Sequence, residues 1–225
     1  MPEDTLLAAL QHGDSFFPSG SVSFSWGLEP LCTDGKVETP NDVARFLEGQ
    51  LQHRWAPMDR VFAATAHRNS KNMEAVLCAD RKMEAMTLPR ELRQGSRASG
   101  KALLHVHEKM GTFPAGLYRK RIHEGDGFGH LAVVQGLLLA NAGLDLQATL
   151  GITAHTTCVG ILGAAVRLGR MGSMESQCIL STLRPVILNL IRTPIPDLDH
   201  AGAYALQTEI AAMRHETQDV RLFSN

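Results

Sequence analysis

The segment from Leu144 to Leu168 restricts the possible folds of this chain more than any other. It is long, it carries almost no charge, and small residues recur along it: Ala148, Gly151, Ala154, Thr156, Thr157, Gly160, Gly163, Ala164 and Ala165. Small side chains on a mostly uncharged helix let neighbouring helices approach closely. We therefore expect this segment to form a helix at the centre of a helical bundle.

Apolar residues recur at helical spacing through most of the remaining chain, and helix start and stop signals separate the segments. Thr39-Pro40-Asn41-Asp42 is the clearest start, because Thr39 can cap a helix whose first position suits proline. The pattern predicts one all-α domain over residues 1–225 with about nine or ten helices and no convincing sheet. Further helices are expected near 4–10, 39–55, 57–69, 72–86, 90–110, 130–141, 174–191 with a kink or break at Pro185, and 199–216.

Two segments are expected to lack regular structure. Residues 111–129 are rich in glycine and proline and contain the basic triplet Arg119-Lys120-Arg121, which indicates a long flexible loop. Within it, Gly125 to Gly129 resembles a phosphate-binding loop only superficially, because no Lys-Ser/Thr follows. Residues 217–225 form a short C-terminal tail whose three apolar residues are unlikely to be fully solvated.

Composition excludes several classes of partner. The net charge is −1 and the pI is near 6.8, so no basic field favours nucleic acid or anionic lipid. The four cysteines are scattered without a Cys-x-x-Cys pair, which fits a reducing cytoplasm better than a zinc site or a disulfide framework. The longest apolar stretch, 131–140, has about half the ~20 residues that a membrane span needs. We expect a soluble cytoplasmic protein.

Residues that could perform chemistry are few. Although the chain has ten histidines, His105 and His107 are two apart and point in nearly opposite directions on a helix, and no metal site is expected. A serine esterase of the GDSL type is the alternative function, with Ser15 as nucleophile and Asp197 and His200 completing a triad. Its context is wrong, because Ser15 follows a leucine-patterned helix instead of a β-strand, and no block for an oxyanion hole is found.

The least generic stretch runs from Pro18 to Glu29. Val22, Phe24 and Trp26 alternate with serines, which taken alone predicts a half-buried strand. The helical surroundings instead favour a glycine-bounded turn that enters a helix and presents Glu29 to a partner.

In their order along the chain, several blocks resemble the UreF family of urease accessory proteins. The stretch above is similar to that family's Pro-x-Gly-x-x-x-x-Ser-x-Gly-Leu-Glu signature, and the last block resembles its C-terminal signature. The chain departs from the family at Val22, Phe24, Ser173 and Asp219-Val220. The matching blocks are Pro18 to Glu29, Glu91-Leu92-Arg93 with Ser96-Arg97 and Gly100, Phe113-Pro114, Ala164 to Leu168 with Gly172, and Met213 to Gln218 with Arg221-Leu222-Phe223.

The resemblance implies an all-α homodimer without catalysis of its own and without a tightly bound cofactor. Such a protein joins a UreD-type (UreH) scaffold to the GTPase UreG, and the assembly delivers nickel to apo-urease. Carried over by position, the residues expected to contact the GTPase are Ser25, Gly27, Glu29 and Arg167. Those expected to contact the scaffold are His215, Arg221, Leu222 and Phe223.

Overall fold

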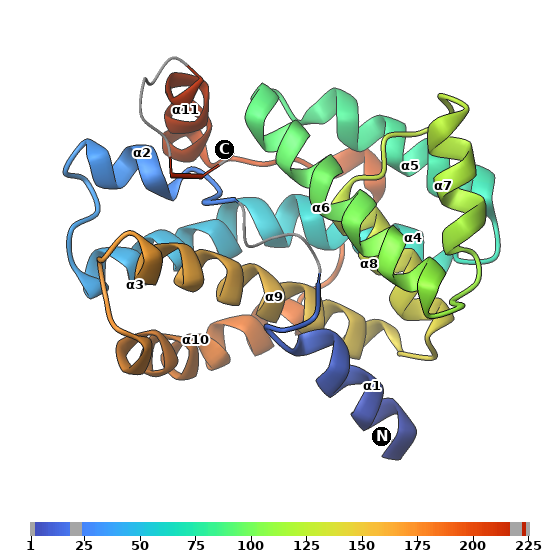
Figure 1. The fold of residues 1–225 in the computed structure, drawn as a ribbon, viewed down its shortest axis with the longest axis horizontal. Coiled ribbons are helices and arrows are strands. Elements are labelled where there is room, and N and C mark those ends of the chain that lie inside the picture. The colour runs from blue at the N-terminus through green and yellow to red at the C-terminus, as the bar shows by residue number, and fades with distance from the viewer. Residues whose placement is uncertain (1–2, 19–23, 217–221, 224–225) are drawn as a thin grey trace.

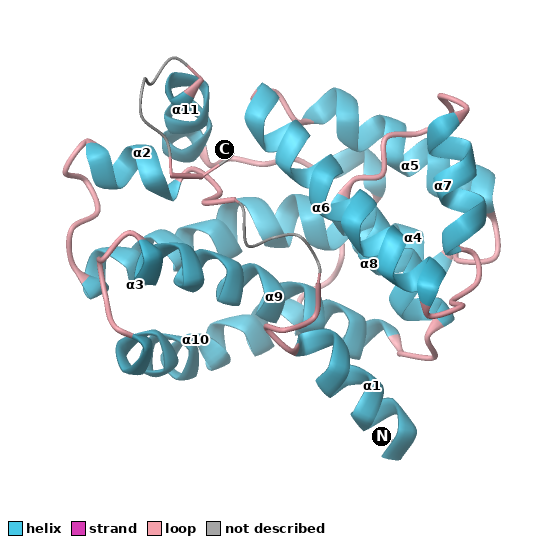
Figure 2. Ribbon diagram, viewed as in Figure 1, coloured by secondary structure: helices cyan, strands magenta, loops and turns pink. Residues whose placement is uncertain are grey.

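Every regular element in the computed structural model is a helix, among the residues it describes: 3–18, 24–216 and 222–223 (Figures 1 and 2). The helices are α1 (Glu3–Gly13), α2 (Leu28–Thr33), α3 (Pro40–Gln50), the π-helix η2 (Leu51–Asp59), α4 (Arg60–Arg68), α5 (Met73–Met86), α6 (Arg90–Lys109), α7 (Ala115–His123), α8 (Leu131–Asn141), α9 (Leu146–Arg167), α10 (Ser173–Arg192), the single-turn η3 (Leu198–His200) and α11 (Leu206–His215). Because α3, η2 and α4 are continuous, the described residues form ten helices besides η3, and 73% of these residues are helical. The predicted all-α class and helix number are confirmed.

Helix α9 lies at the centre of the bundle, as its small residues predict. It packs against α1, α2, α3, α4, α8 and α10. By length and composition α9 could also cross a membrane, with a mean hydropathy of 1.4, but 56% of that window is buried inside the protein, as in the core helices of soluble proteins.

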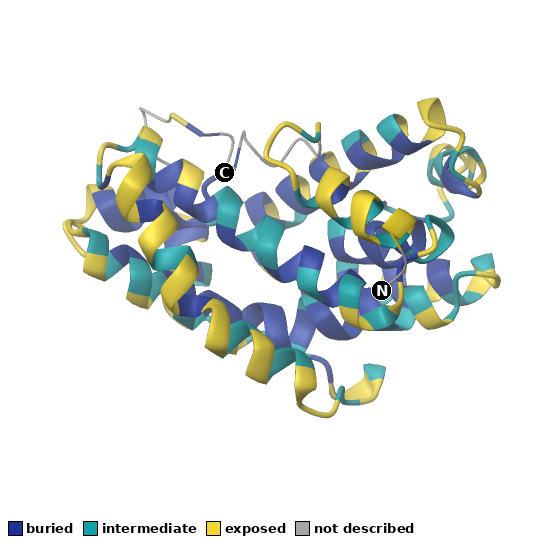
Figure 3. Cartoon of the chain, turned by 90° about the horizontal axis from the view of Figure 1, so that it is seen from below, coloured by how far each residue is buried: buried dark blue, intermediate teal, exposed yellow. Residues whose placement is uncertain are grey.

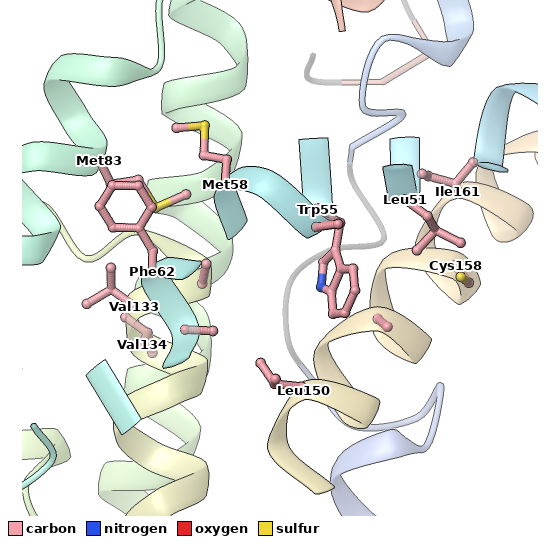
Figure 4. Close-up of a cluster of buried hydrophobic side chains, with 14 of the residues drawn as sticks. Leu51, Trp55, Met58, Phe62, Met83, Val133, Val134, Leu150, Cys158 and Ile161 are labelled. Atoms are coloured by element: carbon pink, nitrogen blue, oxygen red, sulfur yellow. The ribbon is translucent and has the colours of Figure 1, made fainter. Parts of the chain in front are cut away.

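The core fills the space between the helices (Figure 4). Trp55 lies against the α9 side with Leu51, while Phe62 faces Val133 of α8 and Met83 of α5. Exposed residues line the outer faces of the helices, and buried ones face inward (Figure 3). Helices α4 and α8 approach each other closely, because a Cβ added to Gly136 would lie 2.1 Å from the carbonyl oxygen of Ala63.

Pro57 does not begin a new helix, contrary to the sequence prediction. It lies inside η2, and the helical rod continues from α3 to α4. Proline has no N–H, and in an α-helix its ring clashes with the carbonyl four residues earlier, here that of His53. This stretch is π-helical instead, and the His53 carbonyl accepts a hydrogen bond from the Tyr204 N–H at 2.8 Å. Helix α10 likewise runs through Pro185 without a break.

The expected loop at 111–129 is also wrong in part, because residues 115–123 form α7. The connection that follows α7 is fixed by Asp80, whose buried carboxylate accepts the N–H groups of Phe128, Gly129 and His130 at 2.5, 2.9 and 2.9 Å. The glycine-rich run therefore presents its N–H groups to a carboxylate of its own chain, as a phosphate loop would present them to phosphate.

Candidate functional site

The stretch that contains Glu29 leads into a helix, and no strand lies within its described part. Gly27 has φ +83°, precedes α2, and lies against α11: an added Cβ would be 2.8 Å from Thr208 Cγ2. Only glycine combines this backbone conformation with so close an approach. The Ser25 hydroxyl accepts the Glu29 N–H at 3.2 Å, which fixes the first turn of α2.

His215, at the end of α11, lies between two carboxylates. Its Nδ1 is 2.8 Å from Glu91 Oε2 on α6, and its Nε2 is 3.2 Å from Glu29 Oε2 on α2. All three side chains are buried. The His215 ring therefore joins three helices, with one ring nitrogen beside each carboxylate.

Glu29 also binds the end of the chain. Its two carboxylate oxygens accept the N–H groups of Leu222 and Phe223 at 2.6 and 3.0 Å. The Phe223 ring is buried, and the guanidinium of Arg167 lies 4.6 Å from its centroid. We call Glu29, Glu91, His215, Leu222 and Phe223 the C-terminal clasp.

Arg167 is exposed at the end of α9 and covers the clasp from outside. Desolvation beside the Phe223 ring lowers the pKa of its guanidinium from the ordinary value. A second arginine, Arg214, anchors α11. Its guanidinium donates to both carboxylate oxygens of Asp34, at 2.7 and 3.3 Å. The C-terminal segment is thus held by ion pairs and by a buried ring.

Helix α11 packs a face of mostly small side chains against the protein and exposes its large apolar side chains. Thr208, Ala211, Ala212 and His215 are buried, whereas Leu206, Ile210 and Met213 are 69%, 55% and 45% exposed. The three exposed residues recur at i, i+4 and i+7 and form one continuous stripe. We call Leu206, Ile210 and Met213 the α11 stripe.

A second polar feature lies inside the bundle. A cavity of about 50 Å³, large enough for a few water molecules, is lined by Trp26, Trp55, Gln135 and the ion pair of Arg54 Nε with Asp59 Oδ2 at 3.5 Å. Burial raises the pKa of the Asp59 carboxyl, and the nearby Arg54 offsets this only in part. Among the residues that the structure describes, no three His, Cys, Asp or Glu side chains are grouped as metal ligands.

The comparisons with known proteins agree with this architecture. A family model described as UreF matches residues 37–184. The chain belongs to the UreF family. It is 33% identical to the urease accessory protein UreF of Trichodesmium erythraeum over 97% of this chain and 96% of that protein. It is 31% identical to that of Rhodopseudomonas palustris over 92% and 87%, and 28% identical to that of Actinobacillus pleuropneumoniae over 96% and 98%.

The UreF resemblance of the sequence blocks is therefore confirmed, while the structure changes where the family's signature residues lie. Ser25, Gly27 and Glu29 were expected on an exposed face, but all three are buried beneath the C-terminal segment. Of that set, only Arg167 is exposed.

The second set of predicted residues lies in the same place as the first. His215 and Phe223 are buried in the clasp, Leu222 is 63% exposed, and Arg221 lies outside the described residues. The two sets, expected to serve different partners, are joined by direct hydrogen bonds. Glu91 completes the clasp, although it was assigned no role beyond its place in a block that resembles the family. An acidic residue in the first turn of a helix is ordinarily exposed, so nothing in the pattern indicated that Glu91 would be buried.

The esterase alternative is not supported. Ser15 lies in an exposed turn after α1, whereas the segment from Asp197 to His200 packs against α4, and Asp199 pairs with Lys82 of α5. No hydrogen bond joins Ser15, Asp197 and His200 within the described chain. The UreF family supplies accessory proteins, which agrees with a role other than esterase catalysis.

Proposed function

We propose that this protein is a non-catalytic, cytoplasmic assembly factor that joins a UreD/UreH-type scaffold to the GTPase UreG during nickel insertion into apo-urease. Two copies of the chain associate in this assembly. Nickel is the cargo of the complex, and no tightly bound cofactor is required of this chain. The proposal is supported by the family membership and, within the structure, by α11.

Helix α11 is the observation that carries the proposal. Its inner face holds the clasp through His215, and its outer face presents the α11 stripe to solvent. An exposed apolar stripe on a helix, rimmed by polar residues, is typical of a protein interaction surface. The scaffold binds this stripe together with the exposed Leu222.

The clasp gives a physical route between the two partners. A scaffold bound to α11 fixes the position of His215, and His215 contacts Glu29 of α2. It also fixes the position of Phe223, and the Arg167 guanidinium lies over the Phe223 ring. Arg167 then faces the GTPase in one defined orientation. Binding of one partner thereby changes the affinity for the other, and the nucleotide state of the GTPase is coupled to release of nickel toward urease.

The scaffold surface is tested with the double variant Ile210→Asp/Met213→Asp. Because two buried apolar contacts are replaced by charges, binding of purified scaffold protein should weaken at least about 100-fold in calorimetry. Leu88→Asp, at a position that is 67% exposed elsewhere, is the matched control and should bind normally. Deletion of residues 220–225 should also abolish binding. Normal binding by the double variant would rule out the α11 stripe.

The GTPase surface is tested separately with Arg167→Ala. Since Arg167 is exposed, the variant should fold and bind the scaffold normally, yet lose the GTPase in a pull-down and reduce urease activation in cells. Wild-type GTPase binding by Arg167→Ala would remove Arg167 from the proposed surface.

A further inference from the structure

A serine, a histidine and a glutamate from three parts of the chain form a hydrogen-bonded row inside the bundle. The Nδ1 of His130, just before α8, is 3.1 Å from the Ser96 hydroxyl oxygen on α6. Its Nε2 is 2.8 Å from Glu84 Oε2 on α5. Ser96 and His130 are both buried. A row of hydroxyl, imidazole and carboxylate is the arrangement that activates a serine as a nucleophile.

The surroundings set the protonation of the glutamate and the histidine. Burial by itself would raise the pKa of Glu84, but hydrogen bonds from Arg97 and His130 outweigh burial, and the pKa is lowered. Glu84 is therefore a carboxylate, which only accepts hydrogen bonds, so the His130 Nε2 carries a hydrogen. Burial and Arg97 lower the pKa of His130 against the opposing effect of Asp80 and Glu84, so the ring is neutral and its Nδ1 is an acceptor.

The Ser96 hydroxyl is oriented as a donor to this ring. Its oxygen accepts the Leu131 N–H at 3.1 Å, which leaves the hydroxyl hydrogen to point at His130 Nδ1. The histidine is therefore placed to remove the Ser96 proton as a general base, and Glu84 orients the ring and stabilises the charge that forms on it.

The row ends at the small polar cavity described above. Ser96 belongs to the wall of this cavity, whose volume is about 50 Å³. Trp26, Thr156 and Thr157 line it as well and are only half-buried, so the cavity lies next to solvent on their side. The Trp26 backbone has φ +56°, a strained value for a residue other than glycine, and such strain is common at ligand-binding sites.

The start of α8 supplies hydrogen-bond donors at the same cavity. The first hydrogen bond of this helix runs from the Val134 N–H to the His130 carbonyl at 3.0 Å. The N–H groups of Ala132 and Val133 precede it and have no partner within the helix. Ala132 lines the cavity. N–H groups in this position stabilise negative charge that develops on a carbonyl oxygen during attack by a nucleophile.

We propose that Ser96 is a nucleophile that takes one short acyl group from a small activated acyl ester. The Ser96 oxygen attacks the carbonyl carbon, and the Ser96 proton moves to His130 Nδ1. The bond between the carbonyl carbon and the leaving oxygen then breaks, His130 gives the proton to that oxygen, and acyl-Ser96 remains. A cavity that holds a few water molecules limits the acyl group to two or three carbons.

The reaction is a modification of the chain and has no turnover. Because the acyl group fills the cavity, it excludes the water that hydrolysis of acyl-Ser96 would need. One donor is consumed per chain, and no partner protein takes part. The inference therefore goes beyond the proposed assembly role and is independent of it.

The test is to mix the purified full-length chain with p-nitrophenyl acetate, and to follow release of p-nitrophenolate and the masses of the tryptic peptides. The wild type should release one p-nitrophenolate per chain in a burst and carry the acetyl group on Ser96. Ser96→Ala should lose the burst, and His130→Gln should slow it at least about 100-fold. Ser99→Ala removes another buried hydroxyl of α6 and is the matched control, which should react like the wild type.

The pH dependence of the burst separates a general base from a merely structural histidine. With the lowered pKa of His130, the wild-type rate should stay constant from pH 8 down to 6.5 and fall only in more acidic solution. A serine that reacts without a base would instead react faster with every increase in pH. That second profile would overturn the proposal, even if His130→Gln does not fold.

Three further results would also overturn it. One is a burst in Ser96→Ala equal to that of the wild type. Another is acetylation of the wild type on lysines alone. The third is a wild-type rate in His130→Gln with an unchanged circular dichroism spectrum.

Discussion

His215 shows how a single side chain near the end of the chain can organise elements that are distant in sequence. Its two ring nitrogens contact Glu29 and Glu91, 186 and 124 residues away. Glu29 in turn accepts two backbone N–H groups of the tail. Because these side chains are buried, each depends on the others for its hydrogen bonds, and the loss of one leaves a buried polar group without its partner.

Glu29→Ala should therefore destabilise the protein strongly. It removes one partner of the buried His215 ring and the acceptor of two N–H groups, so the free energy of unfolding should fall by about 2–4 kcal/mol in urea denaturation. Glu38→Ala removes an exposed carboxylate near α3 and is the matched control, with a change within about 0.5 kcal/mol. Equal stability of the two variants would contradict the clasp.

His107 should make the protein less stable in acid. Burial, reinforced by the neighbouring His12, lowers the pKa of His107 from 6.5 to about 4. Between these values the unfolded chain binds a proton that the folded ring does not, so stability present above pH 6.5 is lost as the pH falls towards 4. This shift corresponds to at most about 3 kcal/mol.

The measurement is the urea unfolding free energy at pH 7.5, 6.5, 5.5 and 4.5, for the wild type and for His107→Phe, which keeps an aromatic ring beside Phe17. The wild type should lose more stability than the variant over this range. Parallel pH profiles would mean that His107 titrates normally.

At the scale of the element, α1 and α11 share a feature that the sequence pattern could not resolve. Helical periodicity places Leu6, Leu7 and Leu10 on one face of α1, and Leu206, Ile210 and Met213 on one face of α11. Both faces point outward, because the alanines opposite them fit a closely packed body better. An apolar stripe therefore predicts a helix. Where the opposite face carries alanines, however, the pattern does not predict which of the two faces packs against the protein.

The predicted helix boundaries were correct where a local sequence signal sets them. They were wrong where contacts with distant parts of the chain set them. Thr39 caps α3 as predicted, and together with Asp42 it forms a capping box. Pro57 stays within a helix that is π-helical at this point, and Tyr204, far along the chain, donates its N–H to the nearby His53 carbonyl. The same limit applies to the site: signature residues such as Glu29 could be found by pattern, but their burial depends on α11.

The contact between α4 and α8 should tolerate no added methyl group. Gly136→Ala would place Cβ 2.1 Å from a backbone oxygen of α4, and because backbone cannot move aside cheaply, the free energy of unfolding should fall by about 3 kcal/mol or more. Gly163→Ala, on exposed α9 surface with nothing within 4 Å, should instead stabilise by about 0.5–1 kcal/mol. Thermal unfolding of both variants would check the pair, and a stable Gly136→Ala would contradict the packing.

At the scale of the whole molecule, the bundle separates two surfaces. The exposed leucines of α1 (Leu6, Leu7 and Leu10) lie at one edge of the bundle. At the opposite edge lie α11 with its exposed stripe, the clasp and Arg167 (Figure 1). The first half of the central helix α9 contacts α1, and the last residue of α9 is Arg167. The two exposed apolar surfaces therefore lie at different places on one helical core.

The central claim is that the clasp couples the scaffold to the GTPase, and one measurement tests it most directly. The affinity for the GTPase is measured with and without saturating scaffold protein, in the wild type and in His215→Ala. The account predicts that the scaffold raises the wild-type affinity at least about 5-fold, the lower end of ordinary allosteric coupling, and changes that of His215→Ala little. Equal enhancement in both proteins, or none in the wild type, would contradict it.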